Sequence, residues 1–116
     1  MSYVIIVDDD PASLRMAQTM VAQLDWEYVG TSNGAEALAE AQRRKPDLFL
    51  SDTNMPGMGG IELLKIVESD ENFRGIPVIL MSGENREIEA RENGAAAFIQ
   101  KPFRLEDLRA AIEKAM

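Results

Sequence analysis

Residues 3–11, YVIIVDDDP, join a continuous apolar run to three acidic residues and a proline. The run is aromatic and β-branched throughout, which is typical of a strand buried on both faces of a parallel sheet. Acidic residues directly after such a strand are poorly explained as an ordinary solvated turn, so Asp8 and Asp9 are candidates for a functional site. Asp10 and Pro11 favour the start of a helix, because aspartate is a good N-cap and proline fits the first turn.

Short apolar runs and longer amphipathic stretches alternate along the rest of the chain. We expect strands at Tyr3–Val7, Tyr28–Thr31, Asp47–Asp52, Pro77–Ser82 and Ala97–Gln100. Apolar residues at helical spacing predict five helices. The first begins at Pro11, the second spans Ala35–Arg44 and the fourth spans Arg86–Asn93. The third runs through Ile61, Leu64 and Val67, and the last runs through Leu105, Leu108, Ile112 and Ala115. Strict alternation predicts a single α/β domain over residues 1–116, (βα)5, with helices on both faces of a parallel sheet.

Two segments of this pattern are less regular. A glycine-rich loop, residues 56–60, precedes the third helix, and Pro56 is its first residue. The short fourth helix has Ile88 as its one clearly apolar residue and Gly94 as its terminating glycine, so we expect it to be loosely held.

Composition excludes several kinds of chemistry. The chain has 116 residues, 12 Lys+Arg and 20 Asp+Glu, a formal net charge of −8, and neither His nor Cys. Disulfides, thiolate metal sites, a cysteine nucleophile and an imidazole base are therefore absent. The acidic balance argues against binding of nucleic acid, whose phosphates need a positive surface. The start of the chain does not fit a signal peptide and no apolar run would span a membrane, so we expect a cytoplasmic protein.

The polar residues that follow the strands indicate a site. In open α/β sheets, ligands bind beyond the carboxyl ends of the strands. Asp8 and Asp9 follow the first strand, Asp52 ends the third, Ser82 ends the fourth and Lys101 follows the fifth. Three carboxylates brought together repel one another unless a cation binds, and oxygen ligands suit Mg²⁺. A metal, a carboxylate nucleophile, a hydroxyl and a lysine make a plausible set for phosphoryl transfer.

At these positions the chain resembles the receiver domain of bacterial response regulators. The similarity rests on VDDDP at 7–11, DTNMPG at 52–57, MSG at 81–83 and KPF at 101–103, in that order along the chain. It implies a flavodoxin-like, doubly wound parallel sheet with strand order 2-1-3-4-5, and a cis peptide bond between Lys101 and Pro102.

The resemblance also implies a metal site and a phosphoacceptor. Asp52 would accept the phosphoryl group. Asp9 would bind Mg²⁺ directly, Asp8 mostly through a bound water, and Asn54 through its backbone carbonyl; Mn²⁺ could substitute.

Other residues would respond to the phosphoryl group. Ser82 would bind it and move towards it, Lys101 would pair with its oxygens, and Phe98 would stand at the aromatic switch position. Asn54 and Glu84 would tune how fast the group is lost.

The family implies a signalling role with protein partners. A sensor histidine kinase or a histidine phosphotransfer protein would donate the phosphoryl group. A downstream protein would bind the face made by the fourth helix, the fifth strand and the last helix. Such a domain is not an enzyme in the usual sense, since it promotes only its own phosphorylation and dephosphorylation.

Three other functions compete with this one. A small metal-dependent phosphatase of the haloacid dehalogenase type would use Asp8 and Asp10, two residues apart after the first strand. A flavodoxin-like binder of flavin mononucleotide needs a phosphate loop there, which three consecutive aspartates disfavour. A degenerate receiver would bind partners without phosphorylation, although the complete set of acids, hydroxyl and lysine argues against it.

Overall fold

The computed structural model describes residues 2–55 and 57–116, so Pro56 of the glycine-rich loop lies outside the described residues. Its elements are β1 (Tyr3–Val7), α1 (Pro11–Gln23), β2 (Glu27–Thr31), α2 (Gly34–Arg43), β3 (Leu48–Asp52), α3 (Gly60–Ser69), β4 (Val78–Ser82), α4 (Glu87–Glu92), β5 (Ala97–Gln100) and α5 (Leu105–Ala115). Within the described residues, no helix is both long and apolar enough to cross a bilayer.

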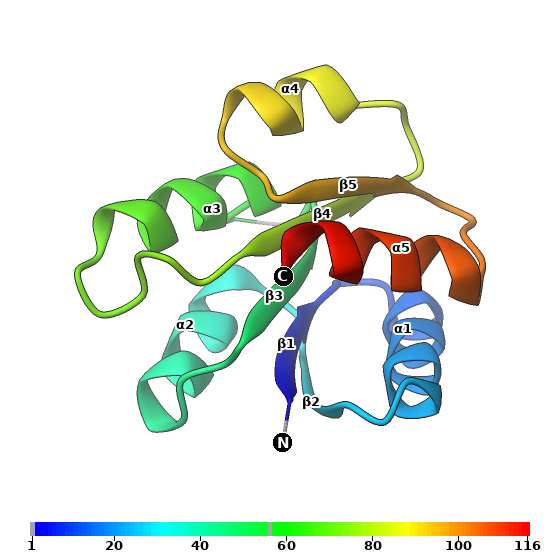
Figure 1. Cartoon of the computed structure of the whole chain (residues 1–116). Helices are drawn as coiled ribbons and strands as arrows, with labels where there is room; N and C mark the ends of the chain where they lie inside the picture. The colour runs from blue at the N-terminus through cyan, green and yellow to red at the C-terminus, as the bar shows by residue number, and fades with distance from the viewer. Residues whose placement is uncertain (1, 56) are drawn as a thin grey trace.

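All five strands are parallel, in the order β2-β1-β3-β4-β5 (Figure 1). This confirms the flavodoxin-like (βα)5 fold and its strand order. β1, β3 and β4 are buried along their whole length, as their continuous apolar runs predict. The carboxyl ends of these three strands therefore lie side by side at one edge of the sheet.

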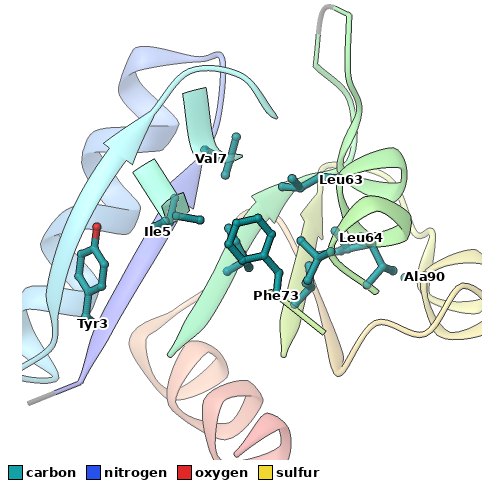
Figure 2. Packing of buried hydrophobic residues seen from close by; sticks show 13 residues of the cluster. Tyr3, Ile5, Val7, Leu63, Leu64, Phe73 and Ala90 are labelled. Atoms are coloured by element: carbon teal, nitrogen blue, oxygen red, sulfur yellow. The ribbon is translucent and has the colours of Figure 1, made fainter. Parts of the chain in front are cut away.

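Alternate residues of the strands build two separate cores. On one face, Ile5 of β1 and Phe49 of β3 pack with residues of α2, α3 and α4 such as Leu63 (Figure 2). On the other face, Ile6 of β1 packs with α1 and α5, including Leu108. The helices thus cover both faces of the sheet, and neither face of the central strands is exposed.

For the five strands, α2 and α4, whose two bounds were predicted, the observed bounds differ by no more than one residue at an end. The fourth helix differs in how it packs. Ala90 is its buried residue, whereas Ile88 is 77% exposed and does not anchor the helix. Gly94 ends α4 as predicted: it has a φ of +95°, and its N–H donates to the carbonyl of Arg91 at 3.1 Å.

Backbone hydrogen bonds extend the strand ladders beyond the strand ends. They run from Asp8 N–H to the Thr31 carbonyl (3.0 Å), from Thr53 N–H to the Met81 carbonyl (2.9 Å) and from Lys101 N–H to the Ser82 carbonyl (2.7 Å). The acidic and basic residues at this edge are therefore fixed by the sheet rather than by free loops. The Lys101–Pro102 peptide bond is cis, as the resemblance implied.

The start of α3 packs directly against the end of β3. A Cβ atom at Gly60 would collide with the backbone carbonyl of Asp52, so only glycine fits this approach. The N–H of Gly60 also donates to the carbonyl of Thr53 at 2.9 Å. Gly60 therefore sets how closely α3 approaches the residue that ends β3.

We expect Gly60→Ala to lower the free energy of unfolding by about 1–3 kcal/mol, because the backbone must move to accommodate the methyl group. Gly83→Ala is the matched control: Gly83 lies in the neighbouring loop and a Cβ there meets nothing within 4 Å. The control should change stability by less than about 0.5 kcal/mol. Urea unfolding measures both, and equal effects of the two variants would contradict the close approach.

Candidate functional site at the carboxyl edge of the sheet

Three carboxylates meet where β1 and β3 end. One carboxylate oxygen from each of Asp8, Asp9 and Asp52 lies within 4.8 Å of the others. Asp8 and Asp52 are buried, and Asp9 is exposed. We call this group the acidic pocket. The structure thus brings together the three acids that the sequence placed at neighbouring strand ends.

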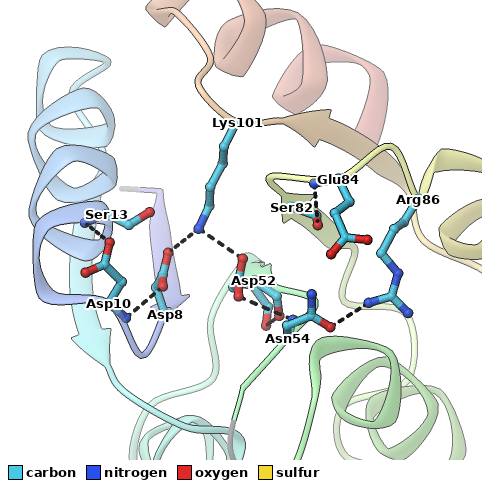
Figure 3. Close-up of polar contacts among 10 residues, drawn as sticks. Asp8, Asp10, Ser13, Asp52, Asn54, Ser82, Glu84, Arg86 and Lys101 are labelled. Carbon is cyan, nitrogen blue, oxygen red and sulfur yellow. Dashed lines mark hydrogen bonds and ion pairs between the residues drawn. The ribbon is translucent and has the colours of Figure 1, made fainter.

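Lys101 bridges the two buried carboxylates (Figure 3). Its Nζ lies 2.8 Å from Oδ2 of Asp8 and 2.9 Å from Oδ1 of Asp52. Burial strengthens such ion pairs relative to exposed ones, because water screens them less. A single ammonium among three carboxylates leaves two negative charges uncompensated.

The pKa values of the two partners reflect burial and pairing together. Burial raises the pKa of the Asp52 carboxyl above its usual value, and the hydrogen bond and charge of Lys101 reduce this rise without cancelling it. Burial opposes the charged form of Lys101, but its hydrogen bonds to Asp8 and Asp52 outweigh this, so the pKa of Lys101 is raised. The lysine therefore stays protonated, whereas ionisation of Asp52 lowers the stability of the native state.

The donor set of the acidic pocket fits a hard divalent cation. Its side chains offer only carboxylate oxygens, which Mg²⁺ prefers over nitrogen and sulfur ligands, and the uncompensated charge matches that of such an ion. Asp8, Asp9 and Asp52 are the residues that could hold it. Asn54 adjoins them, since its backbone N–H donates to Oδ2 of Asp52 at 3.3 Å.

Ser82 and Glu84 lie at the neighbouring edge, after β4. Ser82 is buried, and its Oγ accepts the backbone N–H of Glu84 at 3.1 Å. Phe98 lies apart from them: it is half-buried in β5, packs against the core that α2, α3 and α4 cover, and lines a separate hollow of about 340 Å³ with Lys114 of α5. Glu87 and Arg91 of α4 line the same hollow, so Phe98 lies in the region where α4, β5 and α5 meet.

Asp10 has the capping role that the sequence predicted. Its Oδ2 accepts the backbone N–H of Ser13 at 3.3 Å, and its own N–H donates to Oδ1 of Asp8 at 3.0 Å. Its carboxylate is therefore committed to α1. This disfavours the phosphatase alternative, which needs Asp8 and Asp10 as a working pair.

Two residues of the site were not foreseen from the sequence. Arg86, expected only as the first residue of a polar helix, donates to the side chain of Asn54 across 32 residues of sequence. Thr53 is buried beside Asp52, and its Oγ1 has no hydrogen-bond partner among the described residues. The signal for Thr53 is its position directly after Asp52; Arg86 carries no sequence signal, because its partner lies on another loop.

Comparisons with known proteins identify the family of this chain. Residues 4–113 match the family model of the response regulator receiver domain. The polar-differentiation response regulator DivK of Brucella anthropi is 35% identical over 105 residues, which cover 86% of this chain and 84% of that protein.

Solved structures are similar over nearly the full chain. The chemotaxis response regulator CheY4 of Vibrio cholerae has a TM-score of 0.90 and 29% identity, covering 100% of this chain and 99% of that one. The receiver domain of the sensor histidine kinase PA1611 of Pseudomonas aeruginosa, described with a magnesium ion in its active-site cleft, has a TM-score of 0.87 and 21% identity, covering 98% of this chain and 96% of that one. The second likeness supports the fold.

We expect Asp52→Asn to raise the free energy of unfolding at neutral pH in Mg²⁺-free buffer. Because the native state raises the pKa of Asp52, ionisation of this carboxyl costs native stability as the pH rises through that raised pKa. Below the usual carboxyl range both proteins are neutral at this position, so the gain should disappear in acid.

Urea unfolding in the presence of EDTA at several pH values measures this difference. Glu113→Gln, which removes an exposed carboxylate of α5, is the control and should show no comparable gain. A loss of stability in Asp52→Asn at neutral pH, or a gain that persists unchanged in acid, would be the opposite of the expected result.

Proposed function

The chain belongs to the response regulator receiver domain family, and we propose that it is a phosphoacceptor whose Asp52 takes a phosphoryl group from a partner protein in a Mg²⁺-dependent reaction. The observation that carries the proposal is the arrangement of Asp52 between Lys101 and the other two acids of the pocket. Receiver domains are signalling phosphoacceptors and not enzymes in the usual sense.

Asp52 is the best nucleophile of the three acids. It ends the central strand, and its two oxygens already face different donors, the Nζ of Lys101 and the backbone N–H of Asn54. In the proposed reaction one of these oxygens attacks phosphorus in line, and the bond from phosphorus to the imidazole nitrogen of a phosphohistidine breaks, with its electron pair leaving on the imidazole. Residues 1–116 contain no histidine, so the phosphohistidine must lie outside them.

The site must stabilise the negative charge of the phosphoryl group on Asp52. Lys101 is in place to pair with phosphoryl oxygens, because its ammonium lies 2.9 Å from Oδ1 of Asp52. Asp8, Asp9, Asp52 and the backbone carbonyl of Asn54 would hold the metal ion. Bound there, Mg²⁺ (or Mn²⁺ in its place) would neutralise charge that develops on the phosphoryl oxygens.

Phosphorylation would then alter a partner-binding face. Ser82, which now accepts a hydrogen bond from the backbone of Glu84, would turn its hydroxyl towards the phosphoryl group. We propose that this movement changes the packing of Phe98 and, with it, the face made by α4, β5 and α5. Asn54 and Glu84 would tune the loss of the phosphoryl group.

Kinase and downstream partners follow from the same proposal. A sensor histidine kinase or a histidine phosphotransfer protein would be the donor, and an unknown protein would bind the altered face. The net charge of −8 disfavours direct binding to nucleic acid. We further propose that residues 1–116 act as one receiver domain and that the setting is cytoplasmic.

Phosphorylation can be tested with a small phosphodonor in place of the kinase. We expect the full chain, incubated with acetyl phosphate and Mg²⁺, to gain the mass of one phosphoryl group in intact-mass spectrometry. EDTA should prevent the gain, because the acidic pocket then lacks its cation.

Asp52→Asn should keep the fold, judged by circular dichroism, and gain no mass. Glu113→Gln changes the net charge equally and should be phosphorylated normally. A wild-type chain that gains no mass, or an Asp52→Asn chain that does, would refute the assignment of the phosphoacceptor.

A further inference from the structure

Arg86 links the loop after β3 to α4. Its Nη1 donates to Oδ1 of Asn54 at 2.7 Å, while Nε and Nη2 contact Oε1 of Glu89 at 2.8 and 2.6 Å. Only 25% of the Arg86 side chain is exposed. A planar guanidinium that is bound through three of its nitrogens has one orientation, so Arg86 is a fixed donor and not a mobile surface charge.

Asn54 is consequently held at two points next to the phosphoacceptor. Its backbone N–H contacts Oδ2 of Asp52 at 3.3 Å, and its side-chain oxygen is bound by Arg86 (Figure 3). Since that oxygen accepts from Arg86, the carboxamide cannot rotate without losing a hydrogen bond to a charged group. Lys101 contacts the other oxygen of Asp52, so the two cationic residues act on different sides of the acceptor.

The held carboxamide borders an open hollow beside the acidic pocket. The hollow has a volume of about 520 Å³, and Asp9, Asn54, Arg86 and Glu89 are among the residues that line it. A phosphoryl group on Asp52 is lost when a water oxygen bonds to phosphorus and the bond from phosphorus to the Asp52 oxygen breaks. The carboxylate is thereby restored, inorganic phosphate leaves, and the proton of the water passes to the phosphate or to solvent.

We propose that Arg86 is a positioning residue that prolongs the phosphorylated state: by fixing the Asn54 carboxamide at the edge of this hollow, it restricts the approach of water to the phosphoryl group. The inference rests on the proposed function of Asp52. It does not require Arg86 to touch the phosphoryl group. Removing the guanidinium frees the carboxamide and widens the hollow, so water reaches phosphorus more often.

The test uses the full chain, phosphorylated with acetyl phosphate and Mg²⁺ and then separated from the donor by desalting. Intact-mass spectrometry follows the decay of the phosphorylated fraction. We expect Arg86→Ala to shorten the half-life by at least about threefold. Arg86→Lys, which keeps the charge but lacks the planar fork, should recover only part of the loss.

Arg91→Ala is the matched control. Arg91 also belongs to the α4 region and pairs with a glutamate of that helix, Glu87, but it is 67% exposed and its pairing is confined to α4. Its removal should leave the half-life unchanged. If Arg91→Ala shortened the half-life as much as Arg86→Ala, loosening of α4 would explain both effects and the proposal would fail.

A double variant separates positioning from a direct electrostatic effect. If Arg86 acts through Asn54, then Arg86→Ala should have no further effect on the half-life in an Asn54→Ala background. An equal effect in both backgrounds, or an unchanged half-life in Arg86→Ala alone, would overturn the inference. Failure of the wild-type chain to accept a phosphoryl group at all would instead refute the proposed function, so the two failures are distinguishable.

Discussion

The ion pairs of Lys101 with Asp8 and Asp52 make the carboxyl edge of this sheet possible. Two carboxylates are buried side by side at the ends of adjacent strands, and neither would tolerate the other without a compensating cation. One ammonium compensates only part of the charge of the acidic pocket. The remaining negative charge suits the divalent cation that we propose for this pocket.

The parallel sheet is what imposes this arrangement. β1, β3 and β4 are buried on both faces, which fixes their register, and backbone hydrogen bonds continue beyond their ends to Asp8, Thr53 and Lys101. Gly60 brings the start of α3 against the carbonyl of Asp52. Stability of the two cores therefore offsets the local cost of placing like charges together, as is common at functional sites.

Much of this could be predicted from the sequence, because long apolar runs and caps are local signals. The strands and Asp10 as the N-cap of α1 follow from residue order alone, and the acids at the strand ends follow from the rule for open sheets. The packing of α4 could not be predicted. Six residues are too few for a clear helical period, and the sequence did not show that Ala90, rather than the more apolar Ile88, is buried. The contact of Arg86 with Asn54 depends on the conformations of two loops, which no local pattern encodes.

We propose that occupancy of the acidic pocket is transmitted along the neighbouring strand end. The most direct measurement is the two-dimensional amide NMR spectrum of the full chain before and after addition of Mg²⁺ and beryllofluoride, which mimics a phosphoryl group on a carboxylate. We expect shifts at residues 52–54, at residues 82–86 and at Lys101, reaching Phe98 in β5, and no such shifts in Asp52→Asn. A wild-type spectrum that stays unchanged would contradict this proposal.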